Sequence, residues 1–279
     1  MQTDWVIEAL SATHPDVDFI KVIVETSGDR HDSAPNLGDG IFVKEVQQAV
    51  LAGEADVAVH SLKDLPTDPA PGLIIAAIPL RQDAQDALVG ATLSGLGDGA
   101  RVGTGSPRRT AQLRRLRPDL KVVPVKGNVP TRIAMTTNGD MDAVLLALAG
   151  LRRLGEEPDE ILSTSDMLPA PGQGALAVEC RHDAGELARM LSAIHHEPTR
   201  SAVIAERAVL RNLGGGCLLP VACFAESSGD VLQLESAVTS SDGSRQARAW
   251  AKGKPQSPLG PARKVSAELR RQGAMEMMD

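Results

Sequence analysis

Aromatic side chains are scarce in this sequence of 279 residues: it has no tyrosine, three phenylalanines and two tryptophans. The cores must therefore be filled by Val, Leu, Ile and Ala. No apolar run approaches the roughly 20 residues of a membrane span. The start, MQTDWVIEAL, lacks the basic residues and apolar stretch of a secretory signal. These absences predict a cytoplasmic protein with no membrane partner.

Cysteine is also rare, with three residues and no Cys-x-x-Cys pair. This usage argues against a disulfide framework and a zinc site, so we expect no metal. Cys180 and Cys223 lie in apolar strand patterns and are expected in the core. Cys217 instead follows three glycines in LRNLGGGCLLPVA, where the backbone is free and the sulfur has space. We interpret Cys217 as an attachment point.

The formal net charge of −7 argues against nucleic acid as a partner. Charge is unevenly spread, because residues 101–132 hold nine Lys or Arg against one acid, which makes this segment +8 and the rest of the chain −15. A local cationic surface on an acidic protein favours a small anionic ligand. For Arg114, Arg115 and Arg117 we expect a solvated helix surface instead.

Strand and helix patterns alternate along the first two thirds of the chain. Strands are expected at 17–25, 55–62, 72–78, 86–90, 101–105, 121–126, 143–150 and 175–180. Helices are expected at 2–12, 42–53, from Pro107 and after Asn128. This alternation predicts an α/β fold with mainly parallel sheets. In the last third, helices at 198–213 and 261–272 flank strands at 219–226, 231–238 and 246–251, which predicts a smaller α+β domain.

The alternation restarts near residues 79–82, and the strand at 175–180 follows a loop with two prolines. We therefore expect the chain to return to its first lobe there. The predicted domains are a first lobe of residues 1–79 and 173–195, a second lobe of 82–170 and a C-terminal domain of 197–279. Ligands of such sheets bind at the carboxyl ends of strands, here in the cleft between the lobes.

Two strand-to-helix turns carry cations beside a helix N-terminus. In RVGTGSPRRTAQL, Ser106 is a favoured N-cap, and Arg108 and Arg109 lie in the first helical turn. Cations disfavour that end of a helix, which indicates that an anion binds there, and a guanidinium matches a carboxylate. The alternative is a surface turn with two solvated arginines. VKGNVPTR repeats the pattern with Asn128 and Arg132, which favours a ligand with several carboxylates.

The stretch VHSLKDLPT closes a buried strand with Ser61, Lys63 and Asp64. Asp64 is expected at the carboxyl end of that strand, in the cleft. A carboxylate among so many cations is suited to stabilising a cationic intermediate or moving a proton. The alternative is an inert Asp–Lys pair at a strand end.

Taken together, VHSLKDLPT, GTGSPRRTAQL, GNVPTR, LPAPGQGALAVE and GGGC, in this order and spacing, resemble the porphobilinogen deaminase (hydroxymethylbilane synthase) family. The resemblance runs from about Gln2 to the end of the chain. It implies two lobes like those of periplasmic binding proteins and a third domain. The implied reaction joins four porphobilinogen molecules head to tail, releases ammonia and yields linear hydroxymethylbilane for haem and related tetrapyrroles.

The resemblance also implies a dipyrromethane cofactor, attached by a thioether to Cys217, and a catalytic role for Asp64, which would steady the cation formed as ammonia leaves. A monomer that binds the small molecule porphobilinogen is expected. The implied cofactor contacts are Ser61, Lys63, Thr104, Ser106, Arg108, Arg109, Lys126 and Arg132. The implied substrate contacts are Arg132, Arg153, Gln2 and Phe42.

The sequence departs from the family pattern at its start, because the usual first strand and its RIGTRGSxLAxxQ turn are represented only by Gln2. We expect an exposed sheet edge and apolar face as a result. A misplaced start is our favoured explanation; a truncated gene and a degenerate, inactive copy are the others. Asp39 and Lys126 replace a usual lysine and arginine, and we expect both departures to weaken carboxylate binding without abolishing it. A non-catalytic two-lobed binding protein for a polycarboxylate stays an alternative.

Overall fold

The first lobe is built on a small sheet in the order β1–β8–β2. The structure is a computed structural model that describes residues 1–24, 41–216 and 219–278. The strands of this sheet are β1 (Val57–Ser61), β2 (Leu73–Ala77) and β8 (Leu176–Arg181). Its helices are α1 (Gln2–Thr13), α3 (Ile41–Ala52), α7 (Gly185–Leu191) and the short η1 (Leu62–Asp64) and η2 (Ser192–Ile194). Side chains alternate across β8, so that Val178 packs with α1 on one face and Ala177 packs with α3 on the other.

The second lobe is built on a larger sheet in the order β5–β4–β6–β3–β7. Its strands are β3 (Asp86–Val89), β4 (Arg101–Gly103), β5 (Lys121–Val123), β6 (Ala143–Ala147) and β7 (Glu160–Ile161). Its helices are α4 (Pro107–Leu116), α5 (Val129–Thr137) and α6 (Leu148–Leu154). The strand β6 has the burial expected of a central strand, because its first four residues are fully enclosed.

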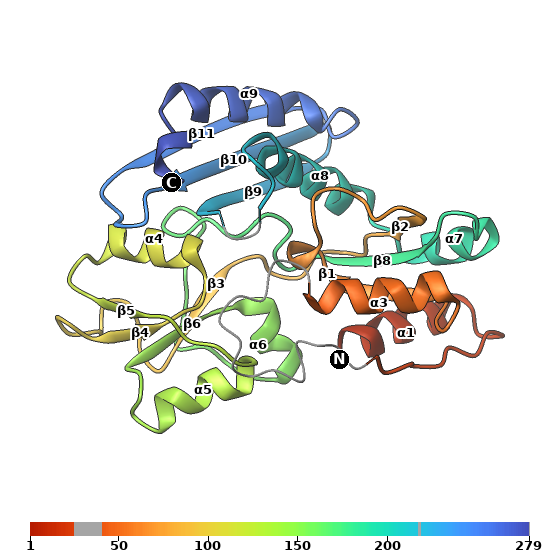
Figure 1. Cartoon of the computed structure of the whole chain (residues 1–279), viewed down its shortest axis with the longest axis horizontal. Helices are drawn as coiled ribbons and strands as arrows, with labels where there is room; N and C mark the ends of the chain where they lie inside the picture. The colour runs from red at the N-terminus through yellow and green to blue at the C-terminus, as the bar shows by residue number, and fades with distance from the viewer. Residues whose placement is uncertain (25–40, 217–218, 279) are drawn as a thin grey trace.

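The third domain lies above the two lobes in the view of Figure 1 and is an antiparallel sheet with two helices on one face. Its elements are α8 (Glu197–Asn212), β9 (Val221–Ser228), β10 (Val231–Thr239), β11 (Gln246–Gly253), α9 (Leu259–Arg271) and η3 (Met275–Met277). Val209 of α8 and Val265 of α9 pack on Leu232 and Leu234 of β10 in one apolar cluster. This confirms the predicted α+β domain.

The α/β class is confirmed, but the second-lobe sheet is mixed and the described first-lobe sheet is antiparallel, so the expectation of mainly parallel sheets is wrong for the first lobe. Strands β1 and β2 are both antiparallel to β8, which lies between them. In the second lobe β4 is parallel to β5 and β6, whereas β3 is antiparallel to β6 and β7. The reason is connectivity: β3 and β8 are the strands that the chain reaches by crossing from the other lobe, rather than through a helix of the same lobe.

The strand predicted at residues 17–25 is absent over 17–24, and residue 25 lies outside the described part. Ile20 and Ile23 are 84% and 82% exposed, although Phe19 packs against the first-lobe core. A strand needs hydrogen bonds to a neighbouring strand, and residues 17–24 pair with none of the described strands, although β1 has an open edge. The β-branched pattern therefore finds no partner here.

Besides the short 3-10 turns η1, η2 and η3, the elements α6, α7 and the two-residue β7 were not predicted. The apolar stretch at 143–150 is split, because β6 ends at Ala147 and α6 begins at Leu148. Continuous burial hides such a change of period, since a buried strand and a buried helix have the same composition.

A buried carboxylate joins the three parts of the molecule. Glu206 of α8 is fully enclosed and accepts hydrogen bonds from both terminal nitrogens of Arg81, at 2.6 and 3.1 Å. Arg81 lies on the first crossing between the lobes. Glu206 also accepts from the backbone N–H of Gly172 on the second crossing, at 2.6 Å, and from that of Ala225 in β9, at 2.8 Å. Both crossings are thereby fixed to the third domain.

We predict that Glu206→Gln destabilises the protein by about 3 kcal/mol, because it leaves the Arg81 guanidinium buried without its counter-charge. The exposed Glu226 on β9 provides a matched control, and Glu226→Gln is expected to change stability by less than about 0.5 kcal/mol. Urea denaturation followed by circular dichroism measures both. Equal midpoints for the two variants would contradict this assignment.

Candidate active site in the cleft between the lobes

Asp64 ends a short turn directly after β1, as the sequence predicted. Leu62 is fully buried and anchors the turn, while Asp64 itself is exposed. The adjacent Lys63 is only partly exposed, and burial lowers the pKa of its amine to about 8 even though the Asp64 carboxylate opposes this shift. Ser61, at the end of β1, accepts a hydrogen bond of 2.6 Å from the side chain of Gln2. Four of the predicted first-lobe residues therefore lie close together, namely Gln2, Ser61, Lys63 and Asp64.

The turn before α4 has the geometry predicted from the sequence. Ser106 is the N-cap, and its hydroxyl accepts from the N–H of Arg109 at 3.4 Å. Thr104 is 2% exposed, and its hydroxyl accepts from the N–H of Ser106 at 3.2 Å. A Cβ on Gly105 would lie 2.7 Å from the carbonyl oxygen of Val125, so only glycine allows the two turns to approach this closely.

Arg108 and Arg109 are buried, and both bind a carboxylate of the protein itself. They are 3% and 6% exposed, and each lies 2.7 Å from an oxygen of Asp86, at the start of β3. Arg108 also donates to the carbonyl of Leu168, and Arg109 to that of Leu145. The two charges that disfavour the start of α4 are thus partly offset from within the fold.

Asp86 stays ionised in this setting. Burial alone would raise the pKa of its carboxyl, but the charges and hydrogen bonds of Arg108 and Arg109 outweigh burial and hold that pKa well below its usual range. Gln173, on the second crossing, donates to Asp86 at 2.8 Å. With two guanidinium groups on one carboxylate, the cluster keeps an excess positive charge.

Sequence reasoning missed Asp86 and Gln173 as parts of this site. Asp86 opens the predicted strand DALVG, where an acid at the edge of an apolar run is a signal that it has buried partners. Gln173 lies between two glycines of LPAPGQGALAVE, both with positive φ. A large polar side chain held by such a backbone indicates a fixed position.

The second cationic turn also matches its prediction. Asn128 caps α5, and its side chain accepts from the N–H of Thr131 at 2.9 Å. Arg132, in the first turn, donates from Nε to the carbonyl of Gly127, and Arg153 of α6 donates to the side chain of Gln82 at 2.9 Å. Lys126, which precedes Gly127, is exposed. Neither Arg132 nor Arg153 forms an ion pair within the described residues.

Electrostatic interactions connect these residues of the first lobe with those of the second. Burial lowers the pKa of Arg153, and the nearby Asp64 carboxylate partly restores it. Burial, and then the like charge of Arg109, lowers the pKa of Arg132. The amine of Lys63 is influenced by Arg109 as well as by Asp64. The two lobes therefore present a half-buried cationic region around the exposed carboxylate of Asp64, which is an environment for a ligand with several carboxylates.

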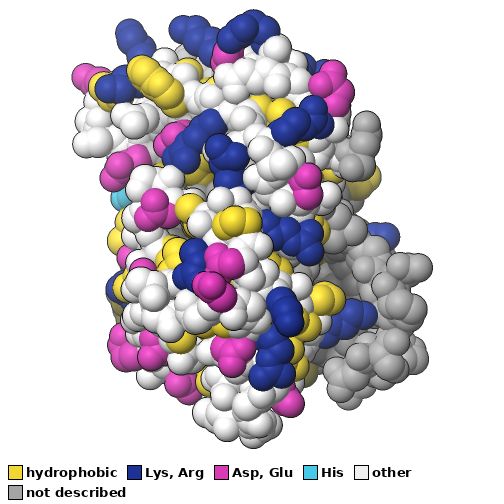
Figure 2. All heavy atoms as spheres, turned by 90° about the vertical axis from the view of Figure 1, so that its left-hand side faces the viewer, with side chains coloured by type: hydrophobic (Ala, Val, Ile, Leu, Met, Phe, Trp, Pro, Cys, Tyr) yellow, Lys and Arg dark blue, Asp and Glu magenta, His cyan; other side chains and the backbone are white. Residues whose placement is uncertain are grey.

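Other cations of the 101–132 segment lie on the surface and have local partners. Arg117 is 2.6 Å from Asp119, and Arg101 is 3.6 Å from Asp142. Arg114 donates to the carbonyl of Ser241 in the third domain, and Arg117 donates to the carbonyls of Leu93 and Leu96. The expectation of simple solvation is therefore wrong for these two residues, whereas Arg115 is exposed. On the face in Figure 2, Lys and Arg side chains are interspersed with acidic ones and form no continuous basic surface.

The predicted attachment point Cys217 lies outside the described residues, but the chain leading to it is described. Gly214 and Gly215 have φ of +123° and +81°, which side chains rarely adopt. A Cβ built on Gly215 would lie 3.3 Å from the hydroxyl of Thr67, three residues after Asp64. The glycine loop therefore approaches the turn that carries Asp64.

The other two cysteines are fully buried, as predicted, and both are free. Burial raises the pKa of the Cys223 thiol well above its usual value, which makes it a poor nucleophile. Phe42 belongs to α3, and its side chain lies outside the described part. Among the described residues, no group of three or more His, Cys, Asp or Glu is placed to hold a metal ion, and no helix is long and apolar enough to cross a bilayer.

Family models match most of the chain. The model described as the porphobilinogen deaminase, dipyromethane cofactor binding domain matches residues 1–189, and that described as the porphobilinogen deaminase C-terminal domain matches residues 201–271. The chain belongs to the porphobilinogen deaminase family. This confirms the resemblance found in the motifs, and the cofactor of the family is the dipyrromethane that the resemblance implied.

Relatives named porphobilinogen deaminase cover nearly the whole chain. The protein from Acidothermus cellulolyticus is 45% identical over 99% of this chain and 87% of its own. That from Desulforudis audaxviator is 44% identical over 99% and 92%, and that from Thermus thermophilus is 46% identical over 90% and 85%. Among solved structures, the BvgS VFT2 domain of Bordetella pertussis is 19% identical over 69% of this chain and 76% of its own, with a TM-score of 0.42.

The lowered pKa of Lys63 predicts a pH dependence of cofactor loading. Its amine loses its positive charge as pH rises through about 8, so we expect assembly of the cofactor on unloaded protein to slow above that pH. In Lys63→Arg the slowing should shift to higher pH, because a guanidinium keeps its proton until roughly pH 12 or above. Intact mass after incubation with porphobilinogen at a series of pH values measures loading. Superimposable pH curves would contradict the prediction.

Proposed function

We propose that the cleft between Asp64 and the four arginines Arg108, Arg109, Arg132 and Arg153 carries out the hydroxymethylbilane synthase reaction. Four porphobilinogen molecules are condensed head to tail, with release of one ammonia for each bond, and the linear product is used for tetrapyrroles such as haem. Each pyrrole unit brings two carboxylates, so a growing chain needs the distributed positive charge that the cleft offers.

The residues present fit a dipyrromethane. Arg132 and Arg153 are half-buried cations without an ion pair among the described residues, and burial lowers the pKa of both, so a carboxylate ligand relieves an unfavourable state. The buried Nε of Arg108 has no hydrogen-bond partner in the described structure. Bound there, the group supplies the pyrrole carbon to which the first porphobilinogen unit is joined.

The remaining cofactor contacts follow from their positions. Ser61 and Lys63 would hold it from the first lobe, and Thr104, Ser106 and Lys126 from the second. Of these, Thr104 is buried, and its hydroxyl accepts from the backbone N–H of Ser106. It therefore supports the shape of the turn more than it contacts the cofactor directly. Gln2 and Phe42 are proposed to contact substrate. The hydrogen bond from Gln2 to Ser61 holds the Gln2 side chain near the turn that carries Asp64.

Approach of the glycine loop to the Asp64 turn is the observation that supports this assignment most directly. Cys217 follows Gly215 by two residues, and Thr67, which Gly215 approaches, follows Asp64 by three. Asp64 is exposed at the carboxyl end of β1 and can face a positive charge that develops on the substrate as ammonia leaves. An exposed carboxylate can also accept the proton lost from the joined pyrrole.

The domain bounds proposed for this chain are 1–79 with 173–195, 82–170, and 197–279. Strand β8 supports the return to the first lobe, since it pairs with both β1 and β2. We further propose that the protein works as a cytoplasmic monomer, without nucleic acid or membrane. The two free, buried cysteines suit a reducing compartment.

We predict that protein produced with its porphobilinogen supply carries a mass surplus equal to one dipyrromethane, and that Cys217→Ser lacks the surplus. Intact-mass spectrometry measures both, and Cys223→Ser, at a buried thiol, serves as the control that keeps it. A surplus that persists in Cys217→Ser would remove the attachment site. An unmodified wild-type chain would favour the non-catalytic binding protein or an inactive copy.

We predict that Asp64→Ala folds and loads its cofactor but loses turnover by roughly three orders of magnitude, because it removes the charge that opposes the developing cation. Product formation from porphobilinogen, normalised to loaded protein, is the measurement. A rate within a few-fold of wild type would exclude Asp64 from the reaction.

A further inference from the structure

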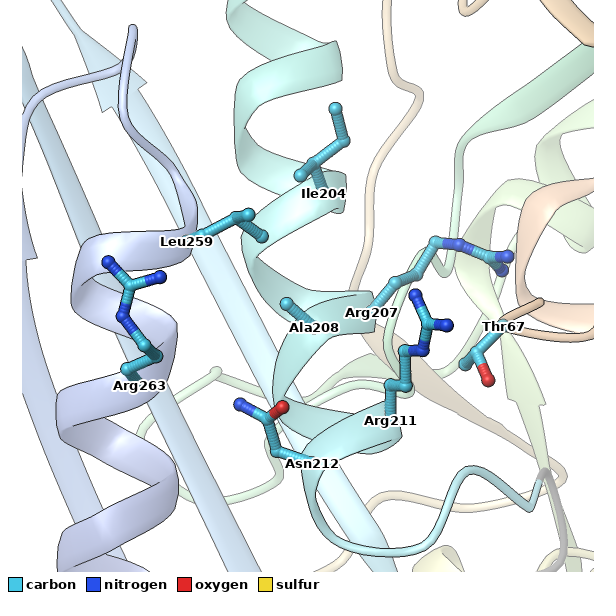
Figure 3. A pocket seen from close by; sticks show the side chains of 8 residues that line it. All are labelled: Thr67, Ile204, Arg207, Ala208, Arg211, Asn212, Leu259 and Arg263. Atoms are coloured by element: carbon cyan, nitrogen blue, oxygen red, sulfur yellow. The ribbon is translucent and has the colours of Figure 1, made fainter. Parts of the chain in front are cut away.

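A guanidinium from the third domain donates hydrogen bonds to the backbone on both sides of Asp64. Arg207 of α8 donates from Nη1 to the carbonyl oxygens of Leu62 and Leu65, at 3.1 and 2.9 Å, and from Nη2 to that of Pro66 at 2.5 Å. Leu62 precedes the Lys63–Asp64 pair, and Leu65 and Pro66 follow it. Figure 3 shows Arg207 reaching from α8 toward the segment that carries Thr67, in the wall of a cavity of about 440 Å³.

This contact uses several N–H groups of one guanidinium, and the compact ammonium group of a lysine cannot reproduce it. The turn η1 is only three residues long, and its backbone bond runs from the N–H of Leu65 to the carbonyl of Leu62, at 3.3 Å. Arg207 adds a second donor to that carbonyl and also binds the carbonyls of Leu65 and Pro66, which follow the turn. The planar fork of arginine presents several N–H groups in fixed directions and can serve three carbonyls at once. Leu62 and Leu65 are both buried, so the backbone is held while the Asp64 side chain stays exposed.

The same helix leads to the attachment loop. α8 ends at Asn212, and Gly215 then lies against Thr67, on the segment that Arg207 holds. Arg207 follows Glu206, whose carboxylate fixes both crossings between the lobes. One turn of α8 thus sets the position of the Asp64 turn relative to the loop that precedes Cys217.

We propose that Arg207 is a positioning residue that holds Asp64 at the correct place relative to the attachment loop. Its side chain contacts the backbone on both sides of Asp64, so the role proposed for it is to hold Asp64 in place. The proposal rests on the proposed function of Asp64 and Cys217. A positioning role predicts loss of rate with little loss of substrate binding, whereas a merely structural role predicts less folded protein with a normal rate per loaded molecule.

Arg211 provides a matched control one turn further along α8. It lines the same cavity, but its 2.7 Å partner is the carboxylate of Asp68, and the two side chains are 64% and 71% exposed. An exposed pair of this kind contributes little to stability or position.

The test compares wild type, Arg207→Gln, Arg207→Lys and Arg211→Gln, all loaded with cofactor. Intact mass gives the loaded fraction, steady-state kinetics give kcat and KM, and hydrogen exchange followed by mass spectrometry reports on residues 62–68. We expect Arg207→Gln to remain loaded, with kcat lower by about 100-fold and KM within about three-fold, because small displacements of a reacting group cost this much. Exchange over residues 62–68 should rise on the order of ten-fold or more, since three hydrogen bonds are lost.

Arg207→Lys should fall between Arg207→Gln and wild type, because an ammonium cannot serve all three carbonyls, and it replaces Arg207→Gln if that variant does not fold. Arg211→Gln should match wild type in every measurement. A normal kcat in both Arg207 variants, or an equal rise in exchange throughout the three domains, would overturn the proposal. Wild type without a mass surplus or product would instead refute the proposed function, while the exchange data would still decide whether Arg207 fixes the turn.

Discussion

A single buried carboxylate, Glu206, constrains the relative positions of the two lobes and the third domain. It is fully enclosed and binds Arg81 together with the backbone N–H groups of Gly172 and Ala225. A buried charge is tolerated only when its hydrogen bonds are satisfied, so these segments must meet at one point. The crossings are tight as well, because a Cβ on Gly174 would lie 2.5 Å from the carbonyl oxygen of Gln82. The two crossings and β9 are therefore held together at this junction.

A second buried carboxylate, Asp86, neutralises part of the positive charge of the candidate site. Asp86 binds Arg108 and Arg109 and leaves the pair with one net positive charge, whereas Arg132 and Arg153 have no carboxylate among the described residues. If carboxylates of the protein neutralised all of these arginines, the region would no longer attract anions. If no carboxylate neutralised any of them, burial of their charges would be too costly. Partial neutralisation keeps the region both folded and cationic. This balance suits a ligand that gains carboxylates as it grows.

Local signals in the sequence predicted much of this site. The caps Ser106 and Asn128, the turn after β1 and the buried Cys223 all depend on short stretches of chain and were correct. Long-range partners were not predictable in the same way. Arg108 and Arg109 were expected to point at a ligand, but their first partner is Asp86, more than twenty residues earlier. Glu206 carried a usable signal, because it lies between Ala202 and Leu210 on the apolar face of its helix. The strand expected at 17–25 does not form over residues 17–24. Strand formation requires pairing with a neighbouring strand, and the strand propensity of a sequence does not show whether that neighbour is present.

The account depends on a pyrrole cofactor that starts at Cys217 and is held by the cations around Asp64. A crystal structure of the protein produced with its porphobilinogen supply tests this most directly. The account predicts density continuous with the sulfur of Cys217, with carboxylates within about 3 Å of Lys63, Arg132 or Arg153, and with Asp64 facing the pyrrole rings. A bare sulfur in a fully folded chain, or a cofactor whose carboxylates lie away from these side chains, would contradict it.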